Sequence, residues 1–194
     1  MKRICVYAGS KPGKNPDYVS AARAVGRTLA GRGIGIVYGG GRNGMMGAFA
    51  DAVLDSGGEA IGVIPRKLTE IEIPHDHLTE LRLVDTMHER KALMADLADG
   101  FIVLPGGFGT LEETLETITW AQLGIHEKPI GLLNVAGYYD PLLSLFVHAQ
   151  EQEFILKEQF GLFIPESDPD RLLDKMAAYS PPALPRGEVG KEIL

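Results

Sequence analysis

Arg90 occupies a position that is unusual for a charged residue. Together with Met87, Met94 and Leu97 it lies on the apolar face of a helix predicted over residues 86–98. A guanidinium on an apolar face needs a partner, because a buried charge without one is costly. That partner is either a carboxylate in a structural ion pair or a group on a bound ligand.

A glycine-rich turn precedes a second residue that could do chemistry. The apolar run at residues 101–104 predicts a buried strand, and Gly106, Gly107 and Gly109 follow it. A helix is expected to begin at Thr110. The N–H groups of such a turn, with the positive end of the helix dipole, can hold a phosphate without any basic side chain.

Glu113 stands in the first turn of this expected helix and allows two interpretations. Thr110 and Glu113 have the spacing of a capping box, in which Glu113 would only bond the start of its own helix. Acidic residues are also favoured there by the helix dipole. Spacing alone favours the cap. In the alternative, the carboxylate acts on a ligand held by the turn.

A second glycine turn, Gly39–Gly44, follows the strand predicted over residues 34–38 and leads into another helix. It fits G-x-G-x-x-G, but the next strand ends in Val63-Ile64-Pro65 without the acidic residue that binds ribose in a dinucleotide site. We therefore interpret the turn as a phosphate or ribose loop for a mononucleotide. Its expected contacts are Gly40, Gly41, Gly44 and Met45.

Residues 65–78 form the longest stretch without a clear period, and they contain His75-Asp76-His77. Two histidines this close suggest a metal site. However, only His88 is easy to propose as a further ligand, and no spacing typical of a zinc site is present. We predict a solvated loop here and no metal.

Two motifs together resemble a known family. The sequence from Pro105 to Glu113 matches the PGGxGTxxE signature of the Lonely Guy (LOG) family, and the Arg-Lys pair of that family stands here in Met87-His88-Glu89-Arg90-Lys91. The resemblance extends from Ile4 to about Phe163. Members of the family are phosphoribohydrolases, which release a purine-type base from its nucleoside 5'-monophosphate.

The resemblance implies roles for individual residues. Glu113 would stabilise an oxocarbenium-like sugar and orient the attacking water, and Arg90 would grip the substrate and fix this carboxylate. Lys91 could add a second contact, although an exposed lysine is the default. The other implied contacts are Gly106, Gly107, Gly109, Thr110, Glu112 and Thr119. A homodimer without a cofactor is also implied.

Three other functions can be compared with the sequence. Similar sequences carry the older label lysine decarboxylase, but a pyridoxal-phosphate enzyme needs a Schiff-base lysine, and no lysine here stands in a recognisable setting. An NAD-dependent oxidoreductase lacks its ribose-binding acid. A nucleotide carrier or sensor of the same fold stays open, although Arg90 and Glu113 argue against it.

The composition limits which partners the protein can bind and which cellular compartment it is expected to occupy. The 194 residues, 45% of them hydrophobic, suit one domain over residues 1–180 with a loose tail over 181–194. The net charge of -7 argues against nucleic acid or an anionic membrane as the main partner, and a small nucleotide remains. A single cysteine, Cys5, indicates a reducing compartment. Without a long apolar run or a secretory signal, we expect a cytoplasmic protein.

Strands and helices alternate along the whole chain. Strands are predicted over residues 4–8, 34–38, 60–64, 81–84, 101–104, 129–133 and 161–164. Helices are predicted over residues 17–32, from the second glycine turn to 55, and over 86–98, 110–123, 138–149 and 170–179. Thr86 and Glu89 have the spacing of a capping box at the start of the helix over 86–98. In the helix over 138–149, the residues expected to face inward are Leu142, Leu145, Phe146 and Ala149. The alternation predicts an α/β fold, a Rossmann-like doubly wound parallel sheet in a single domain.

Overall fold

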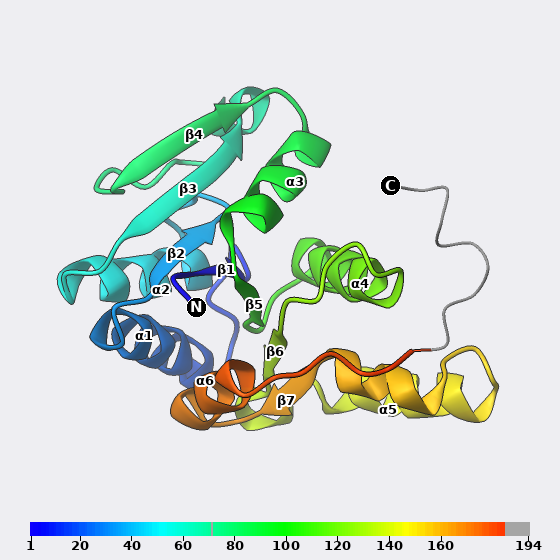
Figure 1. Ribbon diagram of the computed structural model, residues 1–194. Coiled ribbons are helices and arrows are strands. Elements are labelled where there is room, and N and C mark those ends of the chain that lie inside the picture. Colours follow the sequence, from blue (N-terminus) through cyan, green and yellow to red (C-terminus); the bar gives the residue numbers. More distant parts are fainter. Residues whose placement is uncertain (71, 185–194) are drawn as a thin grey trace.

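The computed structural model has the predicted α/β fold, built on one parallel sheet (Figure 1). It describes residues 1–70 and 72–184. Within them, seven strands lie in the order β4-β3-β2-β1-β5-β6-β7, and neighbouring strands are parallel. The strands are β1 (Arg3–Tyr7), β2 (Gly35–Tyr38), β3 (Ala60–Pro65), β4 (Glu80–Val84), β5 (Gly100–Val103), β6 (Ile130–Leu133) and β7 (Ile164–Glu166).

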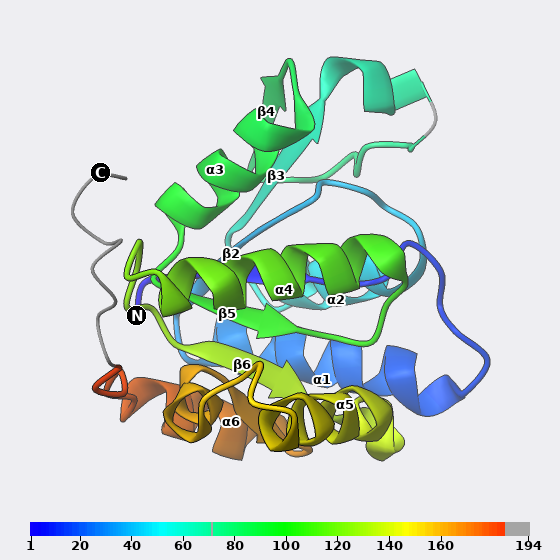
Figure 2. The ribbon, with the colours of Figure 1, turned by 90° about the vertical axis from the view of Figure 1, so that its right-hand side faces the viewer.

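Helices cover both faces of the sheet (Figures 1 and 2). One face carries α1 (Pro16–Gly31), α2 (Gly44–Asp55) and α6 (Pro169–Ala177). The other face carries α3 (Met87–Leu97), α4 (Phe108–Gln122) and α5 (Asp140–Glu151), and Figure 2 shows α4 in front of β5. Short 3-10 helices, η1 (Arg66–Glu70), η2 (Val135–Gly137) and η3 (Lys157–Leu162), lie in the connections.

The sheet has two cores because alternate side chains of each strand point to opposite faces. In β1, Ile4 and Val6 pack with α1 and α2, whereas Cys5 and Tyr7 pack with α3 and α4. All four side chains are at most 3% exposed. Burial on both faces explains why the central strands are continuous apolar runs in the sequence.

The start of α3 is fixed by the predicted capping box. The Glu89 N–H donates to the Thr86 hydroxyl at 3.1 Å, and the Glu89 carboxylate accepts from the Thr86 N–H at 3.2 Å. Both bonds satisfy backbone groups that the helix leaves unpaired. Because the first turn is fixed in this way, the direction of the next residue, Arg90, is set by local structure.

The strand order changes direction at β1. The chain goes from β1 to β2 on one side of the sheet, and β5 joins β1 on the other side. The loops after β1 and β5 meet there, and the Gly9 N–H donates to the Pro105 carbonyl oxygen at 3.1 Å. Ligands of open α/β sheets bind outside the carboxyl ends of the strands at such a point.

Two predictions about the second half of the chain are wrong. Leu145 was expected to face inward but is 58% exposed, because the buried stripe of α5 runs through Phe146. The last strand, β7, overlaps the predicted residues 161–164 only at Ile164, because Gly161 and Leu162 belong to η3. Residues 185–194 of the predicted tail lie outside the described part of the chain.

Candidate active site

The backbone carbonyl oxygens at the end of β5 all have donors. They are Leu104 O with the Tyr139 hydroxyl at 2.7 Å, Pro105 O with the Gly9 N–H at 3.1 Å, and Gly106 O with the Tyr138 hydroxyl. Three consecutive acceptors are therefore satisfied inside the protein. The next backbone groups along the turn are N–H donors.

These donors belong to the first turn of α4. Gly107 is the N-cap and supplies no side-chain cap, and within the described residues the N–H groups of Phe108, Gly109 and Thr110 have no acceptor. A Cβ at Gly107 or Gly109 would meet no atom within 4 Å, so these amides are open to solvent. The end of α4 therefore has the geometry of an anion site.

Gly106 has a different role from the other two glycines. A Cβ there would lie 2.6 Å from the Thr110 Cβ and 2.9 Å from the Gly9 backbone nitrogen. Thr110 itself is 4% exposed. Gly106 is therefore needed for the close approach of the two loops, whereas Gly107 and Gly109 keep the N–H groups accessible.

The capping interpretation of Glu113 is wrong. Helix α4 begins at Phe108, two residues before the predicted start, so Thr110 lies inside the helix and cannot be its N-cap. In the part of the chain that the structure describes, the Glu113 side chain makes no hydrogen bond to the start of α4. The glycine turn allows the earlier start, because the N-cap position accepts Gly107.

The Glu113 carboxyl is half-buried, and its electrostatic environment is unusual. Burial raises its pKa from 4.5 to about 7, although the nearby Arg90 charge lowers it. Glu112 and Glu72 raise this pKa, and Lys91 lowers it. A carboxyl group with a pKa near neutrality is suited to accept and release a proton.

Arg90 is 6% exposed and lies between Glu113 and the second glycine turn. Its Nε is buried without a hydrogen-bond partner, and its Nη1 contacts the Met87 sulfur at 3.8 Å. A Cβ on Gly39 would overlap its guanidinium. No carboxylate of the described residues lies within ion-pair distance of Arg90. The structural ion pair considered for Arg90 is thus not formed, and donors remain for a ligand.

Lys91 is 7% exposed, which corrects the expectation of a solvated lysine. Its Nζ donates to Glu112 Oε1 at 2.6 Å and lies 2.9 Å from Glu116 Oε2. Burial acts to lower the Lys91 pKa, but the hydrogen bonds to Glu112 and Glu116 outweigh it and raise the pKa above the ordinary value. A lysine held in its charged form is poorly suited to form a Schiff base.

The second glycine turn differs from the first. Gly40 and Gly44 have φ values of 80° and 63°, which favour glycine. However, the N–H groups of Met45 and Met46 donate to the Gly9 carbonyl oxygen at 3.0 and 3.3 Å. The Met45 side chain is 1% exposed in the core. Contrary to the prediction, Met45 offers neither its amide nor its side chain to a ligand.

Thr119 lies on the outer face of α4, where its hydroxyl donates to the Leu115 carbonyl oxygen at 2.7 Å. It lies nine positions after Thr110 in the helix, a distance of about 14 Å along the axis. One chain therefore does not bring Thr119 to the glycine turn, contrary to the prediction. Thr119 lines an apolar groove of about 130 Å³ with Leu115, Ile118, Gln122, Phe146, Ile155, Gln159, Phe160, Leu162 and Phe163.

Residues 72–76 pass over the second glycine turn. Pro74 forms an antiparallel bridge with Gly41, and the His75 N–H donates to the Gly40 carbonyl oxygen at 2.9 Å. The His75 ring is not solvated as predicted, because it is buried with its Nε2 2.9 Å from Asp51 Oδ1. These contacts join residues 74–75 to residues 40–51, which are far apart in the sequence.

This segment brings Glu72 to the site, a residue that the sequence analysis missed. A Cβ on Gly41 would lie 3.0 Å from Glu72 Oε1, and the Glu72 charge raises the Glu113 pKa. The candidate site therefore contains Arg90, Glu113, Glu72 and the open end of α4. No sequence signal marked Glu72, because its loop has neither a period nor a motif.

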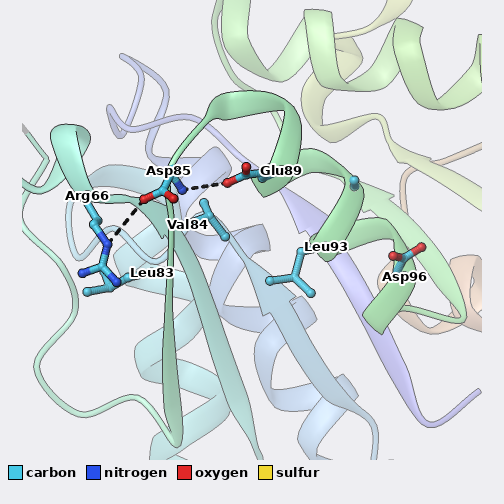
Figure 3. Close-up of a pocket in the computed structure, with 8 residues that line it drawn as sticks. Arg66, Leu83, Val84, Asp85, Glu89, Leu93 and Asp96 are labelled. Atoms are coloured by element: carbon cyan, nitrogen blue, oxygen red, sulfur yellow. Dashed lines mark hydrogen bonds and ion pairs between the residues drawn. The ribbon is translucent and has the colours of Figure 1, made fainter.

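A shallow cavity of about 410 Å³ lies between β4 and α3 (Figure 3). Arg66 lies 3.5 Å from Asp85 at its rim, and the Asp85 N–H donates to Glu89 Oε2 at 2.8 Å. Leu83 and Leu93 contribute its apolar lining. Neither Arg90 nor Glu113 lines this cavity, so it is separate from the candidate site.

The described residues contain neither a metal-ligand cluster nor a helix that could span a membrane. Among residues 1–70 and 72–184, no group of three His, Cys, Asp or Glu side chains could hold a metal ion. In that same part of the chain, no helix has the length and apolar character needed to cross a membrane.

The fold and site define a parallel α/β protein with an open glycine turn, a buried arginine and a glutamate at the switch point of its sheet. Residues 46–176 match the family described as "Possible lysine decarboxylase". The cytokinin riboside 5'-monophosphate phosphoribohydrolase LOG of Oryza sativa subsp. japonica is 51% identical over 93% of this chain and 75% of the relative. LOG3 of Arabidopsis thaliana is 48% identical over 93% of this chain and 84% of the relative. The chain belongs to this LOG phosphoribohydrolase family.

More distant solved structures show the same fold. The molybdenum cofactor carrier protein of Chlamydomonas reinhardtii superimposes with a TM-score of 0.69 at 19% identity, covering 92% of this chain and 99% of that one. The molybdenum cofactor binding protein of Rippkaea orientalis gives a TM-score of 0.67 at 20% identity, covering 92% of this chain and 97% of that one. Function must therefore be argued from the site.

Proposed function

We propose that the protein hydrolyses the N-glycosidic bond of a purine nucleoside 5'-monophosphate, giving the free base and ribose 5-phosphate. The LOG relatives, about half identical to this chain, are named for this kind of cleavage. The observation that carries the proposal is a buried Arg90 that lacks an ion-pair partner within the described residues and lies beside Glu113.

The 5'-phosphate would bind at the start of α4. The open N–H groups of residues 108–110 point out of the helix end, and the helix dipole favours an anion there. The carbonyl oxygens of residues 104–106, which lead into the turn, each accept a hydrogen bond inside the protein, so none of them faces the phosphate as a free acceptor that would repel it. Phosphate binding at this point would place the sugar toward Glu113, one turn further along the helix.

Cleavage would then proceed at C1' of the ribose. As the bond to the base breaks, its electron pair leaves with the base, and positive charge develops on the sugar. The Glu113 carboxylate stabilises this charge and takes a proton from the attacking water, whose oxygen bonds to C1'. The base nitrogen gains a proton from solvent and Glu113 returns its proton to solvent, so that one water is added across the broken bond. Arg90 contacts the substrate and keeps the Glu113 pKa from rising further.

The test is the release of free base, measured by chromatography. We expect turnover of AMP and of isopentenyladenosine monophosphate, assayed side by side to decide between an unmodified and an N6-prenylated base. Adenosine should be a poor substrate, because it lacks the phosphate that the α4 end would hold. Tight binding of both nucleotides without release of base would refute hydrolysis and favour a carrier or sensor.

We also propose that the active form is a homodimer in the cytoplasm. Leu115, which is 43% exposed, lines the apolar groove that contains Thr119, and Phe154, which is 86% exposed, directly precedes Ile155 of the groove. A second copy packed on this surface would bury them and could bring Thr119 to a neighbouring site. Light scattering should give about twice the 21.0 kDa monomer mass, and a monomer at micromolar concentration would refute the dimer. Cell fractionation tests the location.

A further inference from the structure

Lys91 joins the two helices that carry the candidate catalytic residues. Within the described residues, the only hydrogen bonds from α3 to α4 are those of Lys91 to Glu112 and Glu116, at 2.6 and 3.0 Å. We call these three side chains the Lys91 cluster. Each helix otherwise packs mainly on the sheet or on η3.

The Lys91 cluster lies next to the site in sequence and in space. Arg90 directly precedes Lys91, and Glu113 directly follows Glu112. A change in the spacing or rotation of α3 relative to α4 at the cluster must therefore move Arg90 relative to Glu113. Neither Arg90 nor Glu113 has a strong side-chain hydrogen bond of its own among the described residues that would oppose such a shift.

Charge argues that the Lys91 cluster does not serve as the phosphate site. One lysine and two glutamates carry a net charge of about -1 when all are ionised. An approaching phosphate therefore meets a cation that two carboxylates already neutralise. Glu116 is the more buried of the two acids, with 26% of its side chain exposed against 55% for Glu112. Its carboxylate thus faces Lys91 more than solvent.

We propose that Glu116, acting through Lys91, is a positioning residue that holds Arg90 and Glu113 in the geometry for hydrolysis. This role rests on the proposed function, and it differs from a substrate contact of Lys91. A positioning residue should govern kcat more than KM, because the substrate is still held by the end of α4 and by Arg90.

The experiment measures AMP hydrolysis by Lys91→Met, Glu116→Gln and the double variant. Because small misplacements of catalytic groups are costly, we expect kcat to fall about tenfold in Glu116→Gln and about a hundredfold in Lys91→Met, with KM changed by less than about threefold. The double variant should be no slower than Lys91→Met, since both substitutions break one unit. Loss of the Lys91 charge should also move the acid limb of the kcat/KM profile to higher pH, because this charge lowers the Glu113 pKa.

A matched control exists on the opposite face of the sheet. Arg32 of α1 pairs with Asp170 and Asp174 of α6, at 2.9 and 2.6 Å, and so joins two helices in the same manner. Asp174→Asn removes a comparable interhelical charge pair away from the site. It should leave both kcat and the pH profile unchanged, even where it lowers the melting temperature.

Three results overturn the proposal, and they are distinguishable. An active wild-type protein together with a fully active Glu116→Gln variant refutes the positioning role alone. A KM increase without loss of kcat also refutes it, because that outcome assigns the Lys91 cluster to substrate binding. A folded wild-type protein that releases no base refutes the proposed function, and the positioning role fails with it.

Discussion

Replacement of Glu113 by glutamine should make the protein more stable at alkaline pH while removing its activity. Burial raises the pKa of this carboxyl from 4.5 to about 7 in the folded protein. The folded state therefore keeps a proton that the unfolded state releases between these two values. Because the raised pKa favours the protonated folded form, stability is lost as the pH rises through this window.

The size of the effect follows from the pKa difference. A change from 4.5 to about 7 corresponds to about 3 kcal/mol of unfolding free energy once both states are ionised. Solvent access to the half-buried side chain reduces this, and we expect about 2 kcal/mol. Glutamine has nearly the same shape and cannot ionise. The variant should therefore exceed the wild type in stability at pH 8, and by much less at pH 5.

Urea unfolding followed by the fluorescence of Trp120, the single tryptophan, measures this difference. Both proteins are compared at pH 5, 6, 7 and 8 at one protein concentration, since dimerisation would affect apparent stability. Glu127→Gln, at an exposed position, is the control and should show no pH-dependent gain. Activity of Glu113→Gln should fall at least about a hundredfold.

One outcome would contradict the argument directly. If the stability difference between Glu113→Gln and the wild type is the same at pH 5 and pH 8, the carboxyl is not strained by burial. Retained turnover in a folded Glu113→Gln variant would be equally decisive against its role in cleavage.

Further substitutions test other parts of the site. Arg90→Ala should abolish turnover to a similar extent as Glu113→Gln, and the double variant should be little worse if the two residues act together, as measured by adenine release. Gly39→Ala places a methyl group against the Arg90 guanidinium and should lower kcat at least about tenfold with little change in melting temperature. Gly106→Ala meets backbone and Thr110 atoms and should cost about 1–3 kcal/mol in urea unfolding. Phe108→Ala, at a side chain 93% exposed, should change monomer stability by less than about 0.5 kcal/mol.

The fold and the central motif could be predicted because their signals are local. Continuous apolar runs mark the buried strands, and the capping box at Thr86 and Glu89 forms as predicted. The burial of Arg90 followed from its place in an apolar stripe. Each of these features depends on neighbours within a few residues, so one sequence contains the whole signal.

Three of the errors concern contacts between distant segments. Met45 is withdrawn from the site because the Gly9 carbonyl oxygen captures its amide, and no local pattern indicates that bond. Lys91 is buried because it meets carboxylates 21 and 25 residues away. Glu72 reaches the site only because its segment bridges to Gly41 through Pro74. Such contacts form only when the tertiary fold brings these loops and helices together at the carboxyl ends of the strands.

The occupied carbonyl oxygens of Leu104, Pro105 and Gly106 bear on product release and on selectivity by charge. A metal ion or a protonated amine needs oxygen lone pairs, and each of these three oxygens already accepts a hydrogen bond inside the protein. An anion meets neutral N–H dipoles, which hold it without a fixed opposite charge. Such a site can select phosphate esters and still let ribose 5-phosphate depart, so turnover need not be limited by a tightly held product.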